Sequence, residues 1–136
     1  MPDYGELLYY KGARLKIVFA MTSGGDTPGK DFFLKDTKPP AWGKLDRILK
    51  RLGDFGVINN IEQFRPVGNG LHEVKEGGGR RLVGYFLPGH FIITHGFHKR
   101  GGGKSANKFP DTERERALGI RAGFEPHFQR IIRSGQ

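Results

Sequence analysis

Positively charged residues gather on three neighbouring predicted strands, and they are the side chains best suited to chemistry. They are Lys75 in the first strand, Arg80 and Arg81 at the start of the second, Lys99 and Arg100 at the end of the third, and Lys104 and Lys108 in the loop beyond. Tyr85 lies on the strand of Arg81 and, because side chains alternate along a strand, on the same side. Cations bind phosphates and an aromatic ring stacks on exposed bases, so the combination suits RNA. The alternative is that these cations only solvate the edges of a sheet, and the pattern alone favours neither reading.

The histidines offer weaker chemistry. His95 and His98 have the three-residue spacing of a metal pair on a helix, but on a strand residues three apart point to opposite faces. The chain has no cysteine and no carboxylate pair joins the histidines, so we expect no metal site and no cofactor. His95 shares its predicted face with Phe91, Ile93 and Phe97, which favours a hydrogen-bonded core histidine. His98, at the end of the strand, is the better candidate to meet solvent or substrate.

A glycine-rich segment, residues 24–31, has the spacing of a phosphate-binding loop but not its chemistry. Asp31 stands where a Ser or Thr would hold magnesium, and Pro28 lacks one of the N–H groups that should contact the phosphates. A turn followed by a helix cap explains the same residues, so we do not expect nucleotide binding here.

Length and charge set the remaining limits. The chain has 136 residues, with 23 Lys and Arg against 14 Asp and Glu, and its net charge is +9. We expect one domain over residues 1–136, with a core at about 14–122 and a tail, 125–136, that no pattern assigns. No apolar run is long enough to span a membrane, and the first residues lack the pattern of a signal peptide. The sequence therefore predicts a cytoplasmic protein with an anionic partner, nucleic acid before any other, and no membrane partner.

Hydrophobic periodicity predicts the elements that position these residues. Residues 14–21 alternate and predict a strand. Thr27 before Pro28 predicts the start of a short helix that ends before Pro39. A second helix begins near Pro40 and ends at Gly53. Its apolar stripe recurs at steps of three and four, which indicates one buried face: Trp42, Leu45, Ile48, Leu49 and Leu52.

From residue 71 the period changes to two. Residues 71–76, 81–87 and 91–97 predict three strands whose short glycine-containing connections make them antiparallel neighbours. Thr112 with Glu115 predicts a capping box that starts the last helix. The layout of strand, helix hairpin, three-stranded meander and helix predicts an α+β fold with helices packed on a small sheet.

The order of these motifs resembles the RelE/ParE superfamily of bacterial toxins, most closely its HigB-like, phage-related branch. Six landmarks between residues 14 and 122 carry the resemblance. They are Gly25-Asp26-Thr27-Pro28 before Phe32-Phe33-Leu34, the leucine stripe of residues 45–52, the segment 64–75, Arg81-Leu82-Val83-Gly84-Tyr85-Phe86, His95-Gly96-Phe97-His98-Lys99-Arg100, and Pro110-Asp111-Thr112-Glu113 with Ala117. The resemblance implies a RelE-like arrangement of the α+β fold.

The resemblance also implies an activity, that of a type II toxin that cleaves messenger RNA on the ribosome without a metal. Lys75, Arg81 and Lys99 would hold the scissile phosphate while the adjacent 2′-hydroxyl attacks it, and His98 would transfer a proton. We expect Lys75 and Arg81 to contribute to activity rather than to the core. The implied partners are messenger RNA, the ribosome and a cognate helix-turn-helix antitoxin.

Further positions and two alternatives complete the expectation. The predicted RNA-binding residues are Arg80, Tyr85, Arg100 and Lys104. Because glycines 77–79 shift the register, either Arg80 or Arg81 can be the family's arginine. One alternative is a ParE-like toxin that inhibits gyrase and cleaves nothing. The other is a basic RNA-binding protein with no toxic role.

Overall fold

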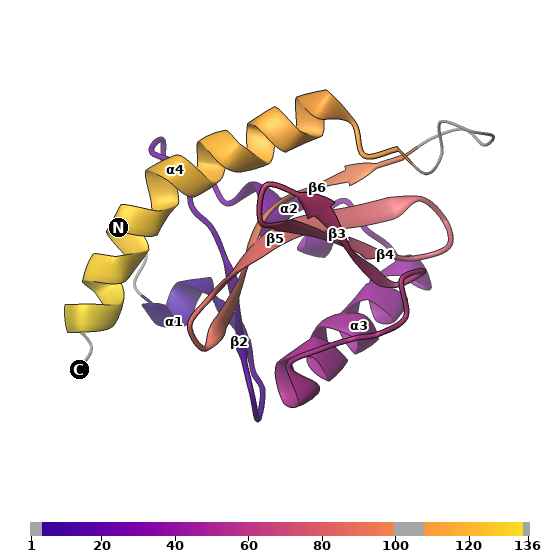
Figure 1. The fold of residues 1–136 in the computed structure, drawn as a ribbon, viewed down its shortest axis with the longest axis horizontal. Helices are drawn as coiled ribbons and strands as arrows, with labels where there is room; N and C mark the ends of the chain where they lie inside the picture. The colour runs from indigo at the N-terminus through magenta and orange to yellow at the C-terminus, as the bar shows by residue number, and fades with distance from the viewer. Residues whose placement is uncertain (1–3, 100–107, 135–136) are drawn as a thin grey trace.

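The computed structural model describes residues 4–99 and 108–134. Its helices are α1 (Tyr4–Leu7), α2 (Pro28–Leu34), α3 (Ala41–Phe55) and α4 (Asp111–Ser134), and its strands are β1 (Leu8–Lys11), β2 (Lys16–Phe19), β3 (Phe64–Gly68), β4 (Leu71–Lys75), β5 (Arg80–Leu87) and β6 (His90–His98). The strands form one sheet in the order β1-β2-β6-β5-β4-β3, with α3 on one face and α4 on the other (Figure 1). The predicted α+β class is confirmed.

The sheet is larger than the sequence predicted. β2 pairs with β6 in parallel, and every other pair of neighbours is antiparallel. The three predicted strands β4, β5 and β6 lie within an antiparallel run of four, because β3 extends it. Pro66 and Gly68 interrupt the apolar alternation of β3, and proline is tolerated there because β3 is an edge strand.

Each face of the sheet carries its own hydrophobic core. On the α3 side, Leu45, Leu49 and Leu52 are fully buried, which confirms the predicted stripe. We call this cluster the α3-side core. Trp42 is only half-buried and stacks on Phe33 with ring centroids 5.4 Å apart. The α4-side core contains the apolar residues of α4 that face the sheet, Ala117, Phe124 and Phe128.

Gly53 does not end α3, contrary to expectation. The helix continues to Phe55, and Gly56 caps it with a φ of 78°. Gly53 is needed inside the helix because its carbonyl accepts hydrogen bonds from the backbone N–H groups of Arg14 and Leu15, and a Cβ at Gly53 would lie 2.9 Å from the Tyr10 ring. The glycine therefore allows the β1–β2 hairpin to pack closely against the helix.

Phe33 is expected to be among the most stabilising residues of the α3-side core. Its side chain has no exposed surface, so Phe33→Ala removes buried area and leaves a cavity. We expect a loss of about 3–5 kcal/mol in the free energy of unfolding, measured by chemical denaturation. Phe55→Ala is the matched control, because Phe55 is 69% exposed, and it should change stability by less than about 0.5 kcal/mol. Equal losses from the two variants would contradict the described core.

A β-bulge in β6 changes the face that the end of this strand presents. Val83 and Gly84 are consecutive on β5 but pair with His95 and Ile93, so Thr94 is an extra residue on β6. Ile93 packs in the α3-side core, whereas His95 turns towards α4. The expectation that His95 and Ile93 share a face is therefore wrong, because the bulge breaks the alternation.

His95 is a buried, hydrogen-bonded histidine, as the sequence predicted. None of its surface is exposed. Its Nε2 lies 3.0 Å from Glu113 Oε1 and its Nδ1 lies 3.1 Å from Thr94 Oγ1. A carboxylate only accepts hydrogen bonds, so Nε2 carries a proton and donates it. This contact joins β6 to the first turn of α4.

His95 is expected to make the protein less stable in acid. Burial, with the nearby charge of Arg116, lowers the pKa of His95 from 6.5 to about 4. Because the pKa is lower in the folded chain than in the unfolded one, this contribution is present above pH 6.5 and is lost as the pH falls towards 4. We expect a loss of about 2 kcal/mol between pH 7 and pH 5. Denaturation at both pH values should show a smaller loss in His95→Gln, and an equal loss would exclude this residue as the cause.

The start of α4 differs from the prediction. The helix begins at Asp111, so Thr112 lies inside its first turn and cannot cap it. The N–H of Arg114 donates instead to the carbonyl oxygen of Pro110 at 3.1 Å. The predicted capping box is therefore wrong by one to two residues, and the proline before Asp111 provides the first carbonyl of the helix.

The tail that no pattern assigned is helical. α4 continues to Ser134 in spite of Pro126. Phe124 and Phe128, four residues apart, lie on one side of the helix and are buried, and the ring of Phe128 stacks on Tyr4. Tertiary packing therefore stabilises a helix that proline disfavours locally. Within residues 4–99 and 108–134, no helix is both long and apolar enough to cross a membrane.

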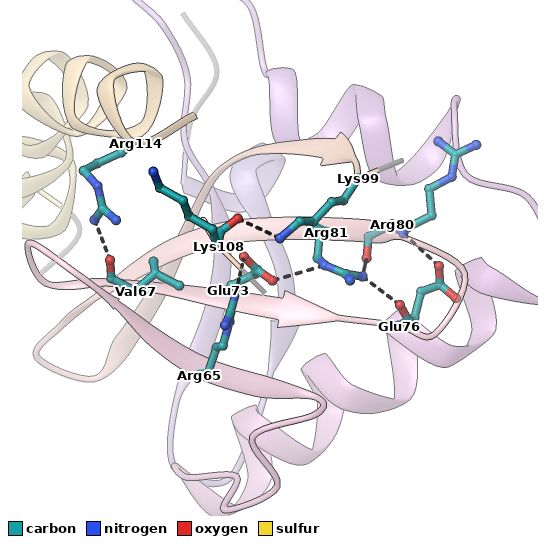
Figure 2. A network of polar contacts seen from close by, with 9 residues as sticks. All are labelled: Arg65, Val67, Glu73, Glu76, Arg80, Arg81, Lys99, Lys108 and Arg114. Atoms are coloured by element: carbon teal, nitrogen blue, oxygen red, sulfur yellow. Dashed lines mark hydrogen bonds and ion pairs between the residues drawn. The ribbon is translucent and has the colours of Figure 1, made fainter. Parts of the chain in front are cut away.

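Two arginines of α4 attach it to the turn between β3 and β4. The guanidinium of Arg114 donates to the carbonyl oxygen of Val67 (Figure 2) and, at 3.1 Å, to Asn69 Oδ1. Arg121 donates to the carbonyl oxygen of Asn69 at 3.2 Å. Arg121 also lies over the ring of Tyr85, with its Cζ 4.7 Å from the ring centroid. α4 is thus fixed across the face of the sheet that carries Tyr85.

Candidate nucleic-acid interface

Four cations surround one buried carboxylate on the α4 side of the sheet. Arg65 comes from β3, Lys75 from β4 and Arg81 from β5, while Lys99 directly follows β6; the carboxylate is Glu73 of β4. Arg65 pairs with Glu73 and Lys75 with Arg81 in the register, and residues two apart on a strand share a face. We call these five residues the Glu73 cluster.

Glu73 lies at the centre of the cluster (Figure 2). Its side chain is completely buried, with Oε1 3.1 Å from Arg81 Nε and Oε2 3.6 Å from a terminal nitrogen of Arg65. The two arginine side chains are themselves largely buried, at 20% exposed for Arg65 and 12% for Arg81. A buried carboxylate needs charged partners, so Glu73 fixes the positions of both guanidinium groups.

Arg81 has further partners that make it part of the folded framework. Its guanidinium donates to the carbonyl oxygens of Glu76, at 2.8 Å, and Arg80, at 3.1 Å. The Glu76 carboxylate accepts hydrogen bonds from the backbone N–H groups of Gly78 and Arg80, at 2.7 and 2.9 Å. This network orders the turn between β4 and β5. Arg81 therefore has a structural role that the sequence did not predict.

Lys75 and Lys99 are the cations of the cluster that form no ion pair with a carboxylate of residues 4–99 or 108–134. Lys99 is half-buried, and its Nζ donates to the carbonyl oxygen of Lys108 at 2.7 Å. Burial lowers the pKa of Lys99; Glu73 opposes this, and the three other cations of the cluster lower the pKa further. Lys99 is therefore a cation whose ammonium is easier to deprotonate than that of an ordinary lysine.

Arg80 and His98 lie on the opposite face of the sheet. They pair with each other in the register, one position along from the pair of Arg81 and Phe97. The guanidinium carbon of Arg80 is 5.4 Å from the ring centroid of Phe32, on the α3 side. His98 is exposed, as predicted, and its Nε2 donates to the carbonyl oxygen of Gly78 at 3.1 Å. Alternation along the strands thus separates these two predicted site residues from the Glu73 cluster.

Tyr85 does not offer a face to RNA in this structure. It lies on the α4 side, as the alternation predicted, but its side chain is completely buried beneath α4. The guanidinium of Arg121 covers its ring. Burial raises the pKa of Tyr85, and its hydroxyl has no hydrogen-bond partner within the described part of the chain. The expectation that Tyr85 stacks on a base is therefore corrected.

Two predicted residues, Arg100 and Lys104, lie outside the described residues. Sequence reasoning in turn missed Arg65 and Glu73. The alternation of Leu71, Glu73 and Lys75 contained a signal for Glu73, because it places a carboxylate directly beside a predicted site cation. Arg65 offered no such signal, because β3 itself was not predicted.

The Glu73 cluster is suited to binding an anion. Four cations against one carboxylate leave an excess of three positive charges at positions that the sheet and Glu73 hold in place. Preorganised positive charge binds phosphate and stabilises negative charge that develops on it. Within the described part of the chain, no group of three or more His, Asp or Glu side chains is placed to hold a metal ion.

No family model matches the chain, and no curated protein matches it.

Proposed function

We propose that this protein is the toxin of a type II toxin-antitoxin system and cleaves messenger RNA on the ribosome as a metal-independent endoribonuclease with a RelE-like fold. The Glu73 cluster is the observation that carries the proposal, because it places four cations from four neighbouring segments around one point. The motif resemblance between residues 14 and 122 is the second support.

The proposed reaction uses a nucleophile that the RNA itself supplies. The 2′-oxygen forms a bond to the adjacent phosphorus while the bond from phosphorus to the 5′-oxygen breaks. The products are a 2′,3′-cyclic phosphate and a 5′-hydroxyl, and the leaving oxygen takes its proton from water. Positioning of the phosphate and stabilisation of its extra negative charge supply the catalysis.

Each cluster residue has a distinct part in this proposal. Lys75 and Lys99 contact the phosphate, since neither has a carboxylate partner in the described chain. Lys99 also accepts the proton of the 2′-hydroxyl, because its lowered pKa increases the fraction of neutral amine. Arg81 adds positive charge from a position that Glu73 fixes.

Mapping of fragment ends tests the reaction. Purified protein is incubated with a messenger RNA, with and without ribosomes, and free RNA is also treated in EDTA. We expect cleavage that EDTA does not stop, fragments ending in a 2′,3′-cyclic phosphate or its 3′-phosphate, and no cleavage where the cut nucleotide is 2′-deoxy. Fragments ending in a 3′-hydroxyl would refute this mechanism. Intact RNA together with blocked DNA supercoiling would establish the gyrase-inhibiting alternative.

Induced expression tests the toxin role. We expect growth to stop on expression of the wild-type chain and to resume when a small helix-turn-helix protein encoded by the neighbouring reading frame is co-expressed. Normal growth together with RNA binding would favour the non-toxic RNA-binding alternative.

A further inference from the structure

A second positively charged site lies on the other side of the sheet from α4. A pocket of about 380 Å³ opens between α3, the segment before β3 and the end of β4. Four cations line it, three of them on α3: Lys44, Arg47, Arg51 and Lys75. We call it the α3 pocket. Helix α3 lies against the face of the sheet opposite α4 (Figure 1), so this pocket is separate from the covered surface of Tyr85.

The cations of α3 form one exposed row. Lys44, Arg47 and Arg51 are spaced by three and four residues, which places them on one side of the helix over about 10 Å. None of them has an ion pair or hydrogen bond to any residue of 4–99 or 108–134. The neighbouring Lys50, by contrast, pairs with Asp46 at 3.1 Å. The row is thus a set of uncompensated charges beside a concave surface.

The acidic residues of the α3 pocket do not neutralise this row. Glu76 lines the pocket, but its carboxylate is buried and accepts two backbone N–H groups of the β4–β5 turn. Glu62 is exposed and forms no ion pair within the described part of the chain. The pocket therefore keeps an excess of positive charge that an anionic ligand can compensate.

Gln63 adds a polar group to the same pocket. Its side-chain oxygen is buried and has no hydrogen-bond partner among the described residues. An unpaired buried acceptor is costly, so the pocket suits a ligand that brings N–H donors as well as negative charge. Phe55, four residues after Arg51 on α3, is 69% exposed and offers an aromatic surface next to the cationic row. Nucleobases supply donors and flat rings, and their phosphates supply the charge.

Lys75 connects the two positive sites. It lines the α3 pocket and also belongs to the Glu73 cluster, where its charge acts on Lys99. We propose that the α3 pocket binds the phosphates and one base of a single-stranded RNA on the segment that flanks the bond cleaved at the Glu73 cluster. This inference rests on the proposed function for the position of the cut, but the binding of RNA in the pocket can be measured without cleavage.

The test uses RNA that cannot be cut. A short oligonucleotide with 2′-O-methyl groups throughout lacks the nucleophile, and its affinity is measured by fluorescence anisotropy over a series of salt concentrations. We expect Arg47→Gln/Arg51→Gln to weaken binding about tenfold or more, and to reduce the slope of log affinity against log salt by about 1.4, at about 0.7 for each lost phosphate contact on a single strand. Both arginines are exposed, so the variant should keep the melting temperature of the wild type.

The matched control removes the same charge elsewhere. Arg130→Gln/Arg133→Gln changes two exposed arginines of α4 and should leave both the affinity and the salt slope close to those of the wild type. Equal weakening by the two double variants would overturn the proposal, because only the net charge would then matter. Binding of polyglutamate but not of RNA, with the same dependence on Arg47 and Arg51, would also overturn it in favour of an acidic protein partner.

The same experiment separates this proposal from the proposed function. If the wild type cuts RNA but Arg47→Gln/Arg51→Gln binds the 2′-O-methyl RNA normally, the α3 pocket is not an RNA site and the nuclease stands. If no RNA is cut under any condition but the double variant binds RNA more weakly than its control, the nuclease proposal fails and RNA binding in the α3 pocket stands.

Discussion

The variant Lys99→Met is expected to cleave RNA about 100- to 1000-fold more slowly than the wild type, with a change in the free energy of unfolding of less than about 1 kcal/mol. Lys99 is half-buried at the end of β6, and its Nζ is held by the carbonyl oxygen of Lys108. No ion pair in the described chain depends on it. Its loss therefore removes a charge from the site without leaving a buried carboxylate unpaired.

The pH dependence of cleavage reports on the same residue. The neutral amine of Lys99 predominates above its pKa, so the rate should rise with pH and level off below the ordinary lysine value of 10.5, since the pKa of Lys99 is lowered. Lys99→Arg keeps the positive charge but cannot lose its proton in this range. We expect this variant to bind RNA normally and to lose the rising limb of the profile.

Lys35→Met is the control for this prediction. Lys35 is exposed on the surface near α2, where it pairs only with Asp31 at 3.4 Å, and the same substitution there should leave the cleavage rate within about twofold of the wild type. If Lys99→Met cleaves as fast as Lys35→Met does, Lys99 takes no part in the reaction.

The α+β class and the central elements could be predicted because their signals are local. The apolar stripe of α3 and the alternation of β4 and β5 each arise from a single element that buries one face. β1 and β3 are edge strands whose stability comes from pairing with a neighbour, and Pro66 weakens the local pattern of β3. The length of α4 likewise depends on Phe124 and Phe128 packing in a core that no local rule describes.

The candidate site could be predicted only as far as parity reaches. Alternation places Lys75 and Arg81 on one face and Arg80 on the other, and the register has this arrangement. Parity does not show what covers a face, so Tyr85 was expected to be free although α4 lies over it. Parity also fails after an extra residue, and the bulge at Thr94 therefore changed the face of His95.

The second large effect is expected at Arg81, and it concerns stability. Arg81→Met leaves the Glu73 carboxylate, which has no exposed surface, with Arg65 at 3.6 Å as its remaining printed ion-pair partner. It also removes the hydrogen bonds to the carbonyl oxygens of Glu76 and Arg80. Breaking a buried ion pair from one side costs about 3–5 kcal/mol. We expect a loss of this size in the free energy of unfolding, measured by chemical denaturation.

A double-mutant cycle shows whether the buried charge causes that loss. Glu73→Gln removes the charge of the carboxylate while keeping its shape, so Arg81→Met/Glu73→Gln should be more stable than the sum of the two single losses allows, by about 1–3 kcal/mol. A sum that is simply additive would mean that Arg81 stabilises the fold through its carbonyl contacts rather than through Glu73. Any fall in cleavage by Arg81→Met must then be compared at a temperature where the variant remains folded, because Arg81 contributes both to the framework and to the charge of the site.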